Sequence, residues 1–288
     1  MQPSPLGHLA GPKPSAWMTA TLRAAHQLFD QPLILSDAMS LRILGAEREA
    51  ALRAEEDRQR HPLAVAMRAT LVVRARLAED SWQAAHSQGV NQYVILGAGL
   101  DTYAYRADCL PTARLYEVDL PAVQQWKRDC LHAAGIAEPA SLHYVATDFE
   151  RNSLSADLQQ AGLDDDAPSC FSWLGVTMYL RPDAVMRTLQ DIASCPQGTS
   201  IVFDYCVHAD QLTEAERVGL QVVTTALAAQ GEHLLSAFAP QRLEHMLHHY
   251  GFSQVEHFGA QELTERYLAD RADDLRLSGI FRMIRATV

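Results

Sequence analysis

The sequence predicts an α/β fold, with a Rossmann-like, seven-stranded and mostly parallel sheet. Three observations support this prediction: short apolar runs alternate with helical patterns from residue 92 onward, proline begins several of those helices, and a glycine turn follows the first run. Such alternation is typical of parallel strands that are covered by helices on both faces. The chain has 288 residues, enough for one domain of this kind with an added cap.

The residues before the first strand are expected to form an arm and a helical cap. Residues 1–15 are rich in proline and are predicted to be a flexible arm, and residues 16–90 are predicted to be the cap. Helical spacing of apolar residues predicts cap helices over 16–29 and 63–87. Ser36 and Asp37 are plausible caps for a helix over 38–44, and the charged, alanine-rich segment 47–60 suits a solvated helix.

Residues 91–288 are expected to form the sheet domain. Apolar runs predict strands at 93–96, 114–118, 142–146, 169–174, 200–206, 253–258 and 280–287. The clearest helices between them are 121–134, 182–194 and 240–250, and a helical segment over 263–273 would permit one antiparallel strand at the edge. An insertion over 208–239 is placed either as a lid over the ligand crevice or as a peripheral packing helix.

The first predicted strand leads into a loop with two glycines, Gly97 and Gly99, followed by Asp101. The glycines allow a tight turn and a close approach of the backbone to a ligand. A helix is expected to begin directly after the loop, over 100–105, with its amides facing the ligand. Thr102 stands where a dinucleotide-binding loop would place a third glycine, so the loop favours a neutral or cationic nucleoside over a diphosphate.

Acidic residues after the next two strands extend this pocket. Glu117 lies 20 residues beyond Gly97, the spacing at which a carboxylate binds ribose hydroxyls. Asp148, which precedes Phe149, could accept a hydrogen bond from an adenine amino group. Each has a simpler alternative: a solvated strand end for Glu117, and a turn or helix cap for Asp148. Together with the glycine loop they predict an adenosine pocket.

Arg74 lies on the apolar stripe of the helix predicted over 63–87. Burial of an arginine costs free energy unless an anion meets it. The residues alone favour an internal carboxylate as this anion, with a ligand as the alternative.

Two motifs in this order, GAGLDTYAYR from Gly97 and YEVDLPAVQQWK from Tyr116, resemble the leucine carboxyl methyltransferase superfamily. The nearest branch comprises bacterial small-molecule O-methyltransferases related to the tetracenomycin polyketide methyltransferase. Residues 73–80 and 172–180 match as well, and the likeness covers residues 30 to about 206. The resemblance implies a class I methyltransferase fold that binds S-adenosylmethionine and releases S-adenosylhomocysteine.

The resemblance also implies roles for single residues. Arg74 would hold the methionine carboxylate of the cofactor, which replaces the internal ion pair as our expectation. Gly97 and Gly99, with Asp101 beside them, would pass beneath the methionine and the ribose. Glu117 would bind the ribose hydroxyls.

The adenine would be framed by Asp148 and Phe149. Leu174 occupies a cofactor-side position where many members carry a glutamate, and this departure leaves the role of that carboxylate open.

Candidate catalytic residues follow from the acceptor chemistry. The sulfonium methyl is already electrophilic, so the enzyme must align a nucleophile and exclude water. A carboxylate acceptor with a pKa of about 4 arrives ionised, whereas a phenol with a pKa near 10 would benefit from a base. The candidates are Tyr179, Tyr205 and His208, although Tyr179 could simply pack beneath the site and His208 could belong to a surface loop.

Composition argues against several other classes of protein. The formal charge of −11 argues against a nucleic-acid partner. No apolar run is long enough to span a bilayer, and no signal peptide is evident. The cysteines are odd in number and form no C-x-x-C motif. We therefore expect a cytoplasmic protein. A metal site is not expected, since His245, His248 and His249 have few carboxylates near them in sequence.

We therefore expect an S-adenosylmethionine-dependent O-methyltransferase that acts on a carboxylate or hydroxyl of a small, secondary metabolite. One alternative is methyl esterification of a protein C-terminal carboxylate. A nicotinamide-dependent reductase is disfavoured by Thr102 and by the lack of a Tyr-x-x-x-Lys pair, and a non-catalytic nucleoside-binding protein is favoured only by Leu174. The sequence leaves open the identity of the acceptor and whether the protein is a monomer or a homodimer.

Overall fold

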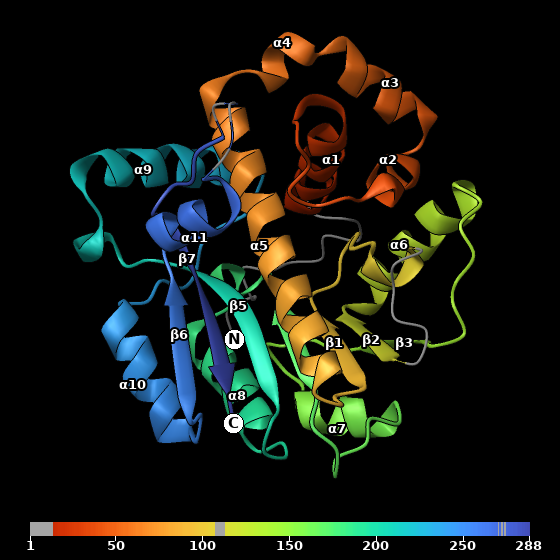
Figure 1. The fold of residues 1–288 in the computed structure, drawn as a ribbon, viewed down its shortest axis with the longest axis vertical. Coiled ribbons are helices and arrows are strands. Elements are labelled where there is room, and N and C mark those ends of the chain that lie inside the picture. Colours follow the sequence, from red (N-terminus) through yellow and green to blue (C-terminus); the bar gives the residue numbers. More distant parts are fainter. Residues whose placement is uncertain (1–13, 107–112, 270, 272, 274) are drawn as a thin grey trace, which may run out of the picture.

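Helices enclose an open sheet on both faces, and further helices gather at one end of the molecule (Figure 1). The computed structural model describes residues 14–106, 113–269, 271, 273 and 275–288, so residues 1–13 of the expected arm and Cys109 lie outside it. The helices are α1 (Pro14–Phe29), α2 (Ala38–Leu44), α3 (Ala46–Ala54), α4 (Glu56–Gln59), α5 (Pro62–Ser87), α6 (Pro121–Ala133), α7 (Leu154–Gln160), α8 (Pro182–Ala193), α9 (Glu214–Ala228), α10 (Pro240–Tyr250) and α11 (Ala260–Tyr267).

The seven strands form one sheet in the order β3-β2-β1-β4-β5-β7-β6. They are β1 (Gln92–Leu96), β2 (Arg114–Asp119), β3 (Leu142–Ala146), β4 (Cys170–Trp173), β5 (Ser200–Cys206), β6 (Gln254–Phe258) and β7 (Phe281–Thr287). The strands β1 to β5 pair in parallel, and β7 is antiparallel to both of its neighbours. The predicted seven-stranded, mostly parallel Rossmann-like sheet is therefore confirmed.

The antiparallel strand is not at the edge, where we had expected it. β7 lies between β5 and β6 and pairs along the whole of β5, from Ser200 opposite Thr287 to Cys206 opposite Phe281. The edge position goes to β6, whose first four residues are exposed or half-buried. The more apolar strand thus takes the inner position and the more polar strand takes the edge.

The core lies on both faces of the sheet. One face carries Leu96, Phe171 and Phe203, which pack with residues of α7, α8 and α10. The other face packs against α5, whose apolar stripe contacts Val202 and Met283 of the inner strands. Figure 1 shows α5 running along this face while α1 to α4 lie beyond the end of the sheet to which the glycine loop belongs.

Several predicted elements differ in extent. The charged segment 47–60 forms two helices, α3 and α4, because only Leu52 and Gln59 on them are buried and little packing supports a continuous helix. The segment 263–273 is helical only as far as Tyr267, the end of α11. The insertion 208–239 contains a short 3-10 turn, η3 (Ala209–Gln211), and then α9. Pro14 and Ser15, which we had assigned to the arm, belong to α1.

Candidate functional site

The glycine loop leaves β1 between the loops that follow β2 and β4. Gly97 has φ +66°, and a Cβ atom there would lie 2.2 Å from Cγ2 of Val176, so a side chain would collide with the loop after β4. Gly99 has φ +46°, and the nearest atom to a Cβ built there would be the Gly97 oxygen at 3.9 Å. Gly97 is therefore required by the protein itself, whereas Gly99 leaves one side of the backbone open to a ligand.

The chain after the loop does not form the expected α-helix. It makes only a single 3-10 turn, η1 (Tyr103–Tyr105), before residue 106. The Asp101 carboxylate accepts the Tyr103 N–H at 2.8 Å, so a side chain binds the amide that a helix would direct to a ligand. Local side-chain bonds of this kind compete with helical hydrogen bonding.

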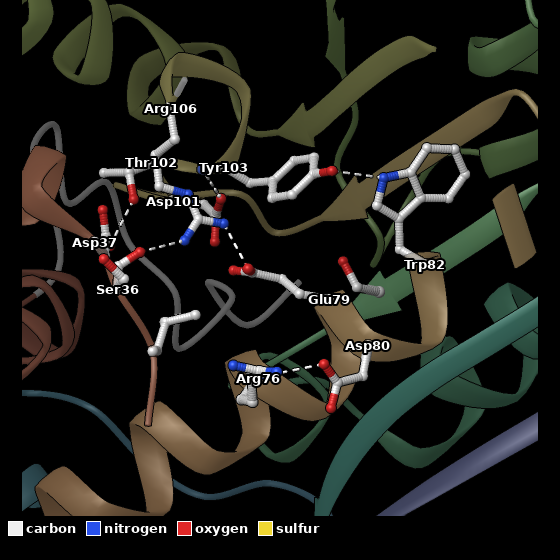
Figure 2. Close-up of polar contacts among 12 residues, drawn as sticks. Ser36, Asp37, Arg76, Glu79, Asp80, Trp82, Asp101, Thr102, Tyr103 and Arg106 are labelled. Carbon is white, nitrogen blue, oxygen red and sulfur yellow. Dashed lines mark hydrogen bonds and ion pairs between the residues drawn. The ribbon is translucent and has the colours of Figure 1, made fainter. Parts of the chain in front are cut away.

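The cap is joined to the glycine loop by Arg23 of α1. Its Nη1 donates to Asp101 Oδ2 at 2.9 Å, and its Nη2 donates to Asp37 Oδ2 at 2.8 Å. The Thr102 hydroxyl donates to the same Asp37 oxygen at 2.7 Å (Figure 2). Burial alone would raise the pKa of Asp101, but the charge of Arg23 holds it below its ordinary value. These four residues, which we call the cap clamp, fix the loop from the cap side.

A second ion pair lies beside the cap clamp, between Glu79 of α5 and Arg106 (Figure 2). Arg106 Nη2 and Glu79 Oε2 are 2.6 Å apart, and Arg106 Nη1 also donates to the Ser36 carbonyl at 3.1 Å. Burial raises the pKa of Glu79 to about 7, against the charge of Arg106. The Trp82 indole of α5 donates to the Tyr103 hydroxyl at 2.7 Å, so α5 holds the loop as the cap does.

The two acidic residues at the end of β2 occupy different environments. Glu117 is 1% exposed, and its Oε2 accepts from Lys127 Nζ at 2.6 Å. Burial raises the pKa of Glu117 to about 7, although Lys127 opposes the shift. Asp119, by contrast, accepts the Gly99 N–H at 2.8 Å. The acid that contacts the glycine loop is thus Asp119, which the spacing argument had passed over in favour of Glu117.

Asp148 and Phe149 follow β3, next to the end of β2. The Thr147 N–H donates to the Asp119 carbonyl at 3.0 Å, which keeps these two strand ends together. Asp148 Oδ1 accepts the Glu150 N–H at 3.0 Å, as a turn residue does. Phe149 is buried, and its ring is tilted against that of Trp173 at 5.6 Å between centroids. The pair therefore lies at the same edge of the sheet as the glycine loop.

Arg74 of α5 forms the internal ion pair that the residues alone had favoured. Its Nη1 donates to Asp204 Oδ2 at 2.8 Å, and the side chains are 13% and 2% exposed. The guanidinium also lies against Gly175, where an added Cβ would be 2.6 Å from Nη2. Asp204 Oδ1 accepts the Gly175 N–H at 2.6 Å, one residue after Leu174. A carboxylate is therefore present beside the Leu174 position, supplied by the neighbouring strand.

Tyr179 ends a 3-10 turn after β4, η2 (Thr177–Tyr179), where the insertion and the cap meet it. Its hydroxyl makes a hydrogen bond with Ser15 of α1, and burial together with the charge of Glu232 raises the pKa of Tyr179 to about 12. Ser15 in turn donates to Glu232 from its backbone N–H at 2.9 Å and from its hydroxyl at 2.6 Å. Among the predicted catalytic residues, Tyr179 is the one that the structure places with cap and insertion side chains.

The other two predicted catalytic residues lie elsewhere. Tyr205 points to the opposite face of the sheet from Asp204, among Phe203 and Phe238, and burial raises its pKa to about 12. The His208 side chain is 52% exposed and pairs with Asp210 at 3.3 Å. The structure therefore does not bring Tyr205 or His208 together with Tyr179.

Sequence reasoning missed four residues that organise the site: Arg23, Asp119, Asp204 and Glu232. Asp119 carried a usable signal, since it ends the β2 motif two residues after Glu117 and would lie on the same face of the strand. The other three had none, because each has a partner far away along the chain: Asp101 lies 78 residues from Arg23, Arg74 lies 130 residues from Asp204, and Ser15 lies 217 residues from Glu232.

Two features are absent from the residues that the structure describes. No group of three or more His, Cys, Asp or Glu side chains there could hold a metal ion. Within the same residues, no helix has both the length and the apolar character needed to cross a membrane.

Comparison with known proteins agrees with the motifs. The family model described as "Leucine carboxyl methyltransferase" matches residues 16–193. YktD of Bacillus subtilis, provisionally named as an S-adenosyl-L-methionine-dependent methyltransferase, is 29% identical over 280 residues, which cover 90% of this chain and 92% of YktD.

Two solved structures share the fold. A DUF574 family protein of Streptomyces avermitilis has a TM-score of 0.59 at 17% identity, covering 96% of this chain and 97% of the other. A protein of Thermobifida fusca, provisionally described as a methyltransferase, has a TM-score of 0.57 at 18% identity, covering 97% and 96%.

Proposed function

Because the chain belongs to the leucine carboxyl methyltransferase family and is an S-adenosylmethionine-dependent methyltransferase, we propose that it methylates an oxygen atom of a small molecule. The observation that carries this proposal is the convergence, at one edge of the sheet, of the glycine loop, Asp119, Asp148 and Arg74. The bound cofactor supplies an electrophilic methyl group on a sulfonium centre. The protein has to hold the cofactor, align the acceptor oxygen with it and exclude water.

The residues present fit this cofactor. The open side of Gly99 admits a close ligand, and the Asp119 carboxylate lies beside it to accept hydrogen bonds from ribose hydroxyls. Asp148 and Phe149 would frame the adenine. The Arg74 guanidinium, fixed by Asp204 against Gly175, would meet the methionine carboxylate with its remaining donors, since a guanidinium has five N–H groups. Arg74 can thus serve both the internal pair and the ligand.

The carboxylate of Asp204 also bears on the departure at Leu174. It lies beside Gly175, so the end of β4 has a carboxylate next to it even though Leu174 replaces the family glutamate. Residues 208–239 are proposed to act as a lid on the acceptor side, because they contact both the loop after β4 and the cap.

Calorimetric titration with S-adenosylmethionine, and with NADH and NADPH in parallel, tests the proposal. We expect a dissociation constant on the order of micromolar for S-adenosylmethionine alone. Arg74→Ala should weaken this binding by about tenfold or more, since it removes a charge-assisted contact. Arg76→Ala is the matched control on the same helix, because its side chain is 45% exposed and pairs with Asp80. Equal affinities in the two variants would contradict the assignment of Arg74.

Acceptors are then sought by mass spectrometry of candidate small molecules incubated with the enzyme and S-adenosylmethionine. We expect an acceptor to gain one methyl group on oxygen. Transfer to a protein C-terminus, with none to any small molecule, would contradict the proposed acceptor class and leave the cofactor assignment intact.

A further inference from the structure

A cavity of about 260 Å³ lies between α7 and α8, over the first half of β4. Phe171, the second residue of β4, lies at its bottom, whereas the glycine loop follows the carboxyl end of the parallel strand β1. Figure 1 shows α7 at the opposite end of the molecule from α1 to α4. The cavity is therefore separate from the proposed cofactor site.

The floor of the cavity is apolar. It consists of five side chains that are each at most 8% exposed: Leu154, Leu158, Leu163, Phe171 and Ile192. The volume is several times the roughly 30 Å³ that a water molecule occupies, and it is close to the lower end of the roughly 300–1,000 Å³ of small-molecule sites. An apolar group placed on this floor would remove apolar surface from water. The cavity thus fits a small molecule with an apolar body.

The rim of the cavity is negatively charged. Asp165 and Asp191 both border it, as does the thiol of Cys195. Burial, followed by the charges of Asp165 and of Asp191, raises the pKa of Cys195 to about 11, so both carboxylates act at the same place. Among the described residues that line the cavity, none is a lysine, an arginine or a histidine. The rim therefore attracts a cation and repels an anion.

The two carboxylates have different roles within the protein. Asp191 Oδ2 accepts the N–H groups of Leu154 and Ser155 at 2.9 and 3.3 Å, so Asp191 fixes the first turn of α7. Asp165 is exposed and accepts a hydrogen bond from the Gln159 side-chain amide. An ionised carboxylate has about four acceptor positions, so each can also accept a hydrogen bond from an ammonium group at the rim. Asp165 is the one whose charge can be removed without disturbing the start of α7.

We propose that the cavity between α7 and α8 binds a small organic cation, an amine with an aliphatic or aromatic body. The body lies on the apolar floor, and the ammonium group lies at the rim between Asp165 and Asp191. An anion of the same shape is repelled by the two carboxylates, and a neutral molecule gains no charge interaction with them. This second site does not depend on the proposed function.

Three probes of similar shape test the charge preference. Saturation-transfer NMR titrations of the whole chain, without cofactor, compare 2-phenylethylamine, 2-phenylethanol and 3-phenylpropionate near neutral pH, where the first is a cation and the last an anion. We expect a dissociation constant on the order of millimolar for the amine, about fivefold tighter binding than for the alcohol, and the weakest binding for 3-phenylpropionate. Added salt should reduce the preference. Equal affinities for the three probes would overturn the proposal.

A pair of neighbouring acids tests whether the preference comes from the rim. Asp165→Asn should weaken binding of 2-phenylethylamine by about threefold and leave that of 2-phenylethanol unchanged. Asp166→Asn is the matched control, because Asp166 is exposed on the same loop but is not among the residues that line the cavity. The same loss in both variants would mean that the amine is attracted by the acidic surface in general, which contradicts the proposed site.

A pair of α7 variants tests the location of the bound amine. Ser155 is exposed and lines the cavity, so the indole of Ser155→Trp should fill it and abolish binding of 2-phenylethylamine. Ala156→Trp is the control on the next residue, which is exposed and outside the lining, and it should bind the amine as the wild type does. Thermal unfolding establishes that both variants are folded. Undiminished binding to folded Ser155→Trp, or displacement of the amine by S-adenosylhomocysteine, would place the amine elsewhere and overturn the proposal.

Discussion

The two sides of the candidate site are fastened to the cap in different ways. On the cofactor side, the cap clamp joins Arg23 to Asp37 and Asp101, whose side chains are 7%, 0% and 19% exposed. On the acceptor side, the hydrogen bonds that join the proposed lid to the cap within the described residues run from Ser15 to the carboxylate of Glu232. The lid helix α9 buries only Leu227. The cofactor side is thus part of the folded core, whereas the acceptor side lies on an element with little buried surface.

This difference has a physical consequence for specificity. Removing one partner from a buried ion pair leaves an uncompensated charge, so the cofactor side cannot change without loss of stability. Residues on a weakly packed lid can change at small cost. We infer that the cofactor side is preserved with the fold, while acceptor preference is set by exposed side chains of the proposed lid.

The largest effect is expected from breaking the cap clamp. Arg23→Met leaves the buried carboxylate of Asp37 without its cation and should lower the free energy of unfolding by about 3–5 kcal/mol. It should also weaken S-adenosylmethionine binding, because Asp101 is no longer fixed. Urea unfolding and calorimetric titration measure the two effects.

Arg53→Met on α3 is the control for the cap clamp variant. Arg53 forms an exposed ion pair with Glu49, with side chains that are 55% and 31% exposed. Its loss should cost no more than about 0.5 kcal/mol. A similar cost for the two variants would mean that the clamp does not carry the stability we assign to it.

The second-largest effect is expected from replacing the two acidic residues of β2, which should change different properties of the protein. Above about pH 7, where the carboxyl group of Glu117 is ionised, Glu117→Gln leaves Lys127, which is 1% exposed, without its charged partner and should destabilise the fold by about 2–3 kcal/mol. Asp119→Asn should leave stability nearly unchanged and weaken S-adenosylmethionine binding by about tenfold or more. Unfolding curves and titration of both variants check this. If instead Glu117→Gln weakened S-adenosylmethionine binding and Asp119→Asn destabilised the fold, Glu117 would be the residue that binds the ribose.

These residues also show which parts of the fold and of the candidate site could be predicted from the sequence. The strands and helices and their order along the chain follow from apolar periodicity, whereas the place of β7 inside the sheet does not. The expected position of the site follows from Gly97 and Gly99, because the glycine signal is local in the sequence. Arg74 was found to need an anion, but its partner Asp204 lies 130 residues away. Likewise, the sequence does not show that Glu117 pairs with Lys127 while Asp119 contacts Gly99. Such pairings depend on tertiary packing, which a single sequence does not encode locally.

A smaller effect on the free energy of unfolding is expected from a change of pH. Burial raises the pKa of Glu117 to about 7 in the folded state, from 4.5 for the ordinary side chain. Between these values the folded state holds a proton that the unfolded chain has released. The free energy of unfolding should therefore fall as the pH rises from about 4.5 to about 7, by about 1–3 kcal/mol, and this group contributes no further change above that range.

Burial shifts the pKa of Glu79 in the same direction, again to about 7, so it adds to the same slope. Glu117→Gln should flatten the dependence by removing one of the two contributions. Urea unfolding of the wild type and the variant, at several values between about pH 5 and pH 7, measures it. Parallel curves for the two proteins would show that Glu117 titrates at its ordinary value.

The smallest effect is expected on the outer face of the lid. Val218 and Val222 of α9 are 58% and 49% exposed, so their replacement by serine removes little buried apolar surface. The double variant should change the free energy of unfolding by no more than about 0.5 kcal/mol, and S-adenosylmethionine affinity should stay the same. A change of about 2 kcal/mol, measured by urea unfolding, would mean that these side chains are covered in solution. The acceptor side would then be as firmly held as the cofactor side, and the contrast between the two would fail.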